Sequence, residues 1–198
     1  MEIPWYGWAL AAVAVVGLWA IGAYNGLMRL QNRVANAFGQ IDVQLKRRYD
    51  LIPNVVEVAR KYLAHEAQTL EAVIAARNQA RATEARAAER PTDGAALAAL
   101  AGAEAALGGA LGRLMAVVED YPELKADQTL RELREELAHT ENRIAFARQA
   151  YNDEVLAYND RVRHFPTVIV ARLFGFGVLA PLQATASDAE RQAPRVQL

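Results

Sequence analysis

The chain contains no cysteine and only one serine, Ser187. The lack of cysteine excludes a disulfide scaffold, a thiolate metal site, a cysteine nucleophile and a lipid-modified cysteine. Ser187 lies in a polar stretch without the glycine-framed motif of a serine nucleophile, so serine catalysis is not indicated. The formal net charge is only -1, which removes the usual electrostatic reason to expect a nucleic-acid partner.

Alanine and other apolar residues dominate the composition instead. Of 198 residues, 41 are alanine and 53% are apolar. A chain of this length can bury one compact core, and its apolar content excludes a wholly disordered protein. Alanine has the highest intrinsic helix propensity, and no segment has a convincing strand pattern. The expected fold class is therefore all-α.

One long run without charge lies near the start, from Trp5 to Tyr24, with the sequence WYGWALAAVAVVGLWAIGAY. A helix of this length spans about 30 Å, the thickness of the hydrocarbon core of a bilayer. Aromatic residues at both ends suit the two membrane interfaces. A cleaved signal peptide usually begins with positive residues, where this chain has Glu2, and a buried soluble helix is the other alternative. We predict a short tail over residues 1–4 and a transmembrane helix over residues 5–24, with the lipid bilayer as its partner.

Basic residues follow the predicted span but do not precede it. No Lys or Arg lies before Tyr24, whereas five basic residues follow closely: Arg29, Arg33, Lys46, Arg47 and Arg48. The positive-inside rule then predicts a single-pass protein whose main domain lies in the cytoplasm. A domain on the outer side of the membrane remains the alternative.

After the span, apolar residues at intervals of three and four predict four long helices. The first carries a stripe from Leu27 to Leu45, and the second is expected to begin after Asp50, a candidate N-cap, with Pro53 in its first turn. This second helix would run over residues 51–88 and outrun the first by about 20 Å.

The other two helices are expected over residues 95–119, after the turn Pro91–Gly94, and from the cap Asp127 to Phe165. Short connections between long helices predict an antiparallel bundle, here over residues 25–182. The last residues, 183–198, are polar and are expected to be disordered.

Three stretches match a known family in its order along the chain. They are YNGLMRLQNRVANAFGQIDVQLKRRYDLIPNVVEVARKY, ALGRLMAVVEDYPELKAD and TENRIAFARQAYNDEVLAYNDRVRHFP. From Tyr24 to about Phe176 the chain resembles the LemA family. The resemblance implies a bacterial, membrane-anchored helical bundle, in the inner membrane, whose molecular function is not established. Some members are lipoproteins on the outer side of that membrane, but the absence of cysteine favours an uncleaved helix here.

Motifs for metal or phosphate chemistry are incomplete. Glu136 and His139 form one Glu-x-x-His pair, but His65 and His164 provide no second copy, and a di-metal bundle site needs two. The glycines of Gly108–Gly112 are not followed by the Lys-Ser/Thr of a phosphate-binding loop. We therefore expect no catalytic, cofactor-binding or metal-binding residues.

Seven polar or aromatic residues of the last helix are the candidates for interaction: Glu141, Asn142, Arg143, Tyr151, Asn152, Tyr158 and Asn159. The two Tyr-Asn pairs are seven residues apart and therefore share one helix face. The tyrosines fall on the buried stripe, and the neighbouring Asn and Arg side chains could tie helices together by hydrogen bonds. The alternative is an exposed recognition surface.

Successive helices of an antiparallel bundle run alternately away from the membrane and back toward it, so the fourth helix should end near the membrane. The following stretch, PTVIVARLFGFGVLAPL from Pro166 to Leu182, is apolar with one charge, Arg172. We expect Phe174, Phe176 and Leu179 to contact the membrane interface or to close the near end of the bundle.

Two functional classes fit these features. The first is a non-enzymatic, membrane-tethered scaffold or adaptor that binds an unidentified membrane or envelope protein. The second is a structural membrane protein that assembles with copies of itself into a homo-oligomer.

Overall fold

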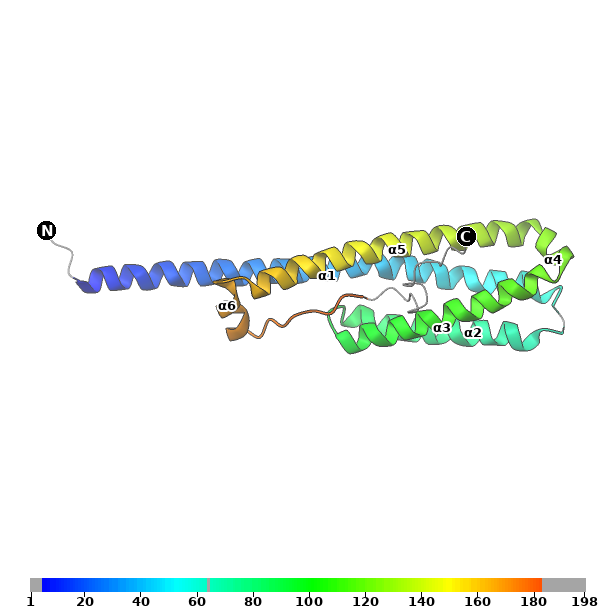
Figure 1. Ribbon diagram of the computed structural model, residues 1–198, viewed down its shortest axis with the longest axis horizontal. Coiled ribbons are helices and arrows are strands. Elements are labelled where there is room, and N and C mark those ends of the chain that lie inside the picture. The colour runs from blue at the N-terminus through cyan, green and yellow to red at the C-terminus, as the bar shows by residue number, and fades with distance from the viewer. Residues whose placement is uncertain (1–4, 64, 183–198) are drawn as a thin grey trace, which may run out of the picture.

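The computed structural model describes residues 5–63 and 65–182 (Figure 1). This part of the chain forms helices without any strand, which confirms the all-α class. The helices are α1 (Trp5–Arg60), α2 (Ala67–Glu89), α3 (Gly94–Glu119), α4 (Pro122–Ala126), α5 (Gln128–Arg163) and α6 (Thr167–Leu173). The predicted tails, residues 1–4 and 183–198, lie outside the described residues.

Helix α1 has 56 residues and continues from the predicted span into the bundle without a break. Its first turns project beyond the other helices (Figure 1). Side chains there, such as Leu10, Val13 and Leu18, are exposed. Within the described residues, two helices are long and apolar enough to cross a membrane, α1 and α3. One third of the apolar window of α3 is buried against other helices, whereas that of α1 is almost wholly uncovered. The start of α1 is thus the better candidate for a membrane span.

The predicted helix boundary at Asp50 is wrong. Tyr49 and Ile52 are both buried, so the apolar stripe of α1 keeps its register through this position, and breaking the helix would cost that packing. Pro53 lacks the N–H that would bond to the Tyr49 carbonyl four residues earlier. The Nε of Arg77, from α2, donates to that carbonyl at 2.8 Å and replaces the missing bond.

The connection between the first two bundle helices therefore lies at residues 61–66, beyond Arg60. Because α1 takes the first ten residues assigned to the second helix, α2 has only 23 residues and is shorter than expected. The expected excess of the second helix over the first is therefore wrong: α1 and α5 extend beyond the α2–α3 pair (Figure 1).

The bundle has two layers. Helix α5 packs along α1, and α3 packs along α2, while contacts between α1 and α2 join the two pairs (Figure 1). The expected antiparallel bundle of four long helices, α1, α2, α3 and α5, is confirmed. Two hollows lie on the side of the bundle between α3 and α5, and we call this side the α3–α5 groove. One hollow is lined by Leu97 and Ala101 of α3 and by the chain up to Leu182. The other is lined by Leu111 and Met115 of α3 and by Leu137 and Glu141 of α5.

Capping residues fix where the later helices begin. Asp93 accepts from the N–H groups of Ala95 and Ala96 at the start of α3, and Asp127 accepts from Leu130 N–H at 3.0 Å at the start of α5. The expected turn before α3 and the expected cap at Asp127 are both confirmed.

Helix α6 ends in a tight turn that redirects the chain. Gly175 has φ +75°, and the N–H of Phe176 bonds to the Ala171 carbonyl at 2.9 Å, which is the Schellman arrangement. Phe174 and Phe176 pack edge-on against Tyr24, with ring centroids 5.0 and 5.4 Å away. Phe174 and Phe176 therefore close the end of the bundle nearest the predicted span, which was one of the two positions expected for them.

Candidate functional site

Beyond Phe176 the chain runs in an extended conformation along the bundle (Figure 1), and we call residues 177–182 the C-terminal segment. Two side-chain amides of α5 hold its backbone. Asn159 donates to the Leu179 carbonyl and accepts from the Leu179 N–H, both at 2.8 Å. Asn152 does the same with Leu182, at 3.1 and 2.9 Å.

The spacing of these two amides matches an extended chain. Asn152 and Asn159 are seven residues apart on a helix, which is about 10.5 Å. Leu179 and Leu182 are three residues apart, and an extended chain covers about 10 Å in that interval. Both amides can therefore bind backbone groups at once, and they make no demand on the side chains of the bound segment.

The segment inserts a side chain between the helices. Leu182 is buried in a hollow formed by Ile41 and Leu45 of α1 and Leu100 of α3. Arg148 of α5 lines the same hollow, and its Nε has no hydrogen-bond partner among the described residues. The C-terminal segment thus occupies the near end of the α3–α5 groove.

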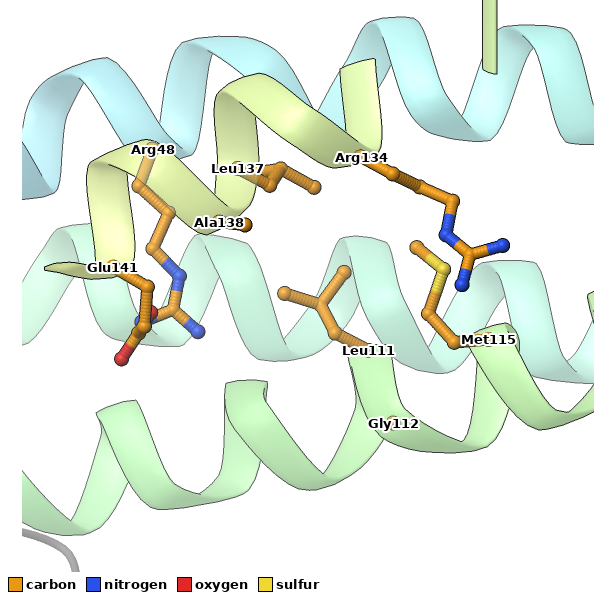
Figure 2. A pocket seen from close by; sticks show the side chains of 8 residues that line it. All are labelled: Arg48, Leu111, Gly112, Met115, Arg134, Leu137, Ala138 and Glu141. Carbon is orange, nitrogen blue, oxygen red and sulfur yellow. The ribbon is translucent and has the colours of Figure 1, made fainter. Parts of the chain in front are cut away.

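Farther from the predicted span, the same groove is open. A cavity of about 240 Å³ lies between α3 and α5, and its wall is mostly apolar. Figure 2 shows the side chains that line it. The cavity is lined by Leu111, Gly112 and Met115 of α3, by Arg134, Leu137, Ala138 and Glu141 of α5, and by Arg48 of α1. Leu111 lies ten residues, or about 15 Å, beyond Ala101 on α3.

An ionic cluster adjoins this cavity through Arg48 and Glu141, which line it. Arg48 Nη1 lies 2.9 Å from Glu104 Oε2 and 3.0 Å from Glu141 Oε2. The Tyr49 hydroxyl donates to Glu104 Oε1 at 2.6 Å. Burial, followed by the nearby Glu104 carboxylate, raises the pKa of Tyr49, so the phenol stays protonated as a donor. The cluster connects α1, α3 and α5 across the groove.

A second cluster lies between α1 and α2. Lys46 Nζ is 2.7 Å from Asp42 Oδ2 and 3.7 Å from the buried Glu84 Oε1. Asp42 Oδ1 and Glu84 Oε1 are buried and accept from no donor among the described residues, so a proton on one carboxyl group would allow it to donate to the other. Burial, and then the hydrogen bond to Asp42, raises the pKa of Glu84 to about 7.

The candidate residues of the last helix take different places. Tyr151 and Tyr158 are buried, and the Tyr151 hydroxyl donates to the Pro91 carbonyl at 3.1 Å. Asn142 and Arg143 are exposed. Asn152 and Asn159 make the expected kind of tie, but to the C-terminal segment rather than to another helix.

Residues Arg48, Tyr49, Glu84 and Glu104 did not emerge as candidates from the sequence. Glu104 carried a usable signal, because it is the sole acid in α3 before Glu119. Nothing in the sequence indicated that Arg48 is buried, because a basic residue beside the apolar face of a helix is usually exposed to solvent. Among the described residues, no group of three or more His, Asp or Glu side chains is arranged to hold a metal ion.

Comparison with known sequences adds a family and three relatives. The sequence model of the LemA family matches residues 37–198. Magnetosome protein MamQ of Magnetospirillum gryphiswaldense is 39% identical over 84 residues, which are 42% of this chain and 31% of that protein. Magnetosome proteins MamQ 1 and MamQ 2 of Paramagnetospirillum magneticum are each 41% identical over 78 residues, 39% of this chain and 29% of each relative. The chain therefore matches under a third of the length of these relatives.

Proposed function

The chain belongs to the LemA family, and we propose that it is a membrane-tethered, non-enzymatic adaptor that binds an extended segment of another membrane or envelope protein in the α3–α5 groove. The family assignment and the apolar start of α1 support membrane association of a helical protein. The observation that carries the finer proposal is the C-terminal segment, because the groove already holds one extended chain through Asn152 and Asn159.

The open cavity offers what a second extended segment would need. Leu111, Met115 and Leu137 present apolar surface, and the guanidinium of Arg134 lies at the rim (Figure 2). A partner side chain placed there would continue the line that Leu182 begins, in the same groove and about 15 Å farther along α3. Extended peptides bound in this way gain affinity from backbone bonds and specificity from side-chain pockets.

Site-directed photo-cross-linking in native membranes tests the proposal. A photoreactive phenylalanine analogue replaces Ala138, an exposed cavity residue, and in a matched variant it replaces Phe146, which is exposed on the outer side of α5. We expect a foreign membrane or envelope protein to cross-link at position 138 and not at position 146.

Filling the cavity provides the specificity control. A Cβ added at Gly112 meets nothing within 4 Å, so a side chain at this position begins in open space, and Gly112→Phe is chosen to fill the cavity. The cross-link from position 138 should then disappear. Adducts between copies of this chain alone would instead support the self-assembling alternative and reject the adaptor.

The bundle is proposed to lie on the cytoplasmic side of the inner membrane. The support is the basic residues that follow the span, beginning with Arg29. Because the chain lacks cysteine, Val43→Cys introduces one exposed thiol. A membrane-impermeant maleimide should label it only after the inner membrane is broken, and labelling of intact spheroplasts would place the bundle outside.

A further inference from the structure

Helix α6 exposes apolar side chains on one side, contrary to the usual pattern of a helix in water. Ile169 and Leu173, one turn apart on α6, are 56% and 77% exposed, and Phe165, in the connection just before α6, is 79% exposed. On the opposite side, Val170 and Ala171 are buried against the bundle. Such a concentration of exposed apolar groups on a small element marks a contact surface.

The position of α6 along α1 indicates what covers this surface. Phe174 packs against Tyr24, the last residue of the charge-free run. Together with Ala20 and Ile21, these two rings line an entirely apolar hollow of about 200 Å³. Phe174 therefore reaches the final turn of the predicted span. Figure 1 shows α6 beside α1 and below the end of α5, with its axis turned away from that of α1, close to where α1 leaves the bundle.

Charged residues flank the apolar surface at the corresponding level. Arg172 and Arg163 are exposed on and beside α6, and Arg29 is exposed five residues beyond Tyr24 on α1. Guanidinium groups at this level suit lipid phosphates, while apolar side chains suit the acyl region just below. Continuity with the apolar surface of α1 favours lipid over a second protein as the cover.

We propose that α6 is a second membrane contact, lying in the bilayer interface with Phe165, Ile169 and Leu173 inserted among the acyl chains. The inference rests on the proposed membrane anchor and goes beyond it. The bundle is then held to the bilayer at two places, the span of α1 and the side of α6, and its orientation relative to the membrane is fixed.

Spin-label accessibility in vesicles of phosphatidylglycerol and phosphatidylethanolamine tests this contact on the full chain. Single cysteines replace Ile169 or Leu173, and each carries a nitroxide label; the native chain has no thiol to interfere. Collisions with oxygen, which concentrates in lipid, should rise several-fold relative to a label at Phe146, and collisions with a water-soluble nickel chelate should fall. Phe146 is a matched control because it is an apolar residue of similar exposure, at 73%, on α5.

A label at Val13 separates this inference from the anchor itself. Lipid accessibility at position 13 with aqueous accessibility at 169 and 173 would overturn the α6 contact and leave the anchor standing. Aqueous accessibility at all three positions would overturn both. Protection of positions 169 and 173 from both collision partners would show a protein cover, such as a second copy, and would also overturn the lipid contact.

Discussion

At the scale of single residues, the buried charges of the bundle depend on complete pairing. Arg48 and Glu104 are both buried, and each has a second partner, Glu141 for the arginine and Tyr49 for the glutamate. A buried charge that loses its partner retains the cost of desolvation without compensation. The cluster beside the cavity is therefore sensitive to single changes although its total contribution to stability is modest.

Removing one member should destabilise the fold strongly. We expect Glu104→Leu to lower the free energy of unfolding by about 3–5 kcal/mol, because Arg48 and the Tyr49 hydroxyl both lose their buried acceptor. Urea denaturation in mild detergent, followed by helical circular dichroism, measures the change. Arg33→Leu, which breaks the exposed pair with Glu154, should cost under about 1 kcal/mol. Equal losses in the two variants would contradict the burial argument.

The carboxyl pair between α1 and α2 predicts a pH dependence. Burial raises the pKa of Glu84 to about 7 in the folded chain, from 4.5 in its ordinary state. The folded chain then binds a proton that the unfolded chain releases, so stability should fall as the pH rises from about 4.5 through 7. Denaturation midpoints across this range should slope downward in the native chain and less steeply in Glu84→Gln, which cannot ionise.

The titration of Asp42 does not overlap the pH range in which Glu84 is expected to lose its proton. Burial alone would raise the pKa of Asp42, but its hydrogen bonds with Glu84 and the Lys46 ammonium outweigh burial and leave the pKa below its usual value. Asp42 therefore titrates at a lower pH than Glu84. A slope that is identical in the native chain and in Glu84→Gln would assign the pH dependence to other groups.

At the scale of helices, α1 shows why a local boundary signal can fail. Asp50 followed by Pro53 is a common helix start, but the apolar stripe continues through Tyr49 and Ile52 in unbroken register. The Arg77 side chain donates to the Tyr49 carbonyl that Pro53 leaves without a donor, and Arg77 is 28 residues from Tyr49 in the sequence. A contact at that separation has no local trace in the sequence.

A double-mutant cycle tests this compensation. Arg77→Met should destabilise the fold by about 1–3 kcal/mol, because the Tyr49 carbonyl loses its donor. In a Pro53→Ala background the backbone N–H of residue 53 can donate to that carbonyl, so the same arginine change should cost clearly less. Thermal melting of the four proteins measures the coupling. Additive losses would show that Arg77 contributes in some other way.

The C-terminal segment depends on two amide side chains of α5. We expect Asn152→Ala combined with Asn159→Ala to release it, because all four hydrogen bonds between these amides and the segment are lost. Hydrogen exchange should accelerate at the amides of Leu179 and Leu182, which donate to these side chains. Asn142→Ala, an exposed change on the same helix, should leave both amides protected. Unchanged exchange in the double variant would show that side-chain packing alone holds the segment.

At the scale of the whole molecule, apolar periodicity and short connections were enough to predict four long helices in antiparallel order. They could not predict the α3–α5 groove, because a stripe shows which face is buried but not which neighbour buries it. The pairing of Asn152 and Asn159 with Leu182 and Leu179 likewise depends on the turn at Gly175, which brings the chain back along α5.

The continuity of α1 gives the last prediction, which concerns how the bundle stands on the membrane. From Tyr24 to Arg60 the helix has no interruption, so its far end lies about 54 Å from the end of the span. Energy transfer from a dye at Arg60→Cys to acceptor lipids in the bilayer surface should therefore be weak, whereas a dye at Arg29→Cys should transfer strongly. A flexible four-glycine insertion after Asn25 should raise transfer from position 60, because the bundle can then tilt toward the surface. Strong transfer from position 60 without the insertion would show that α1 lies along the bilayer, and the in-plane placement of α6 would fail with it.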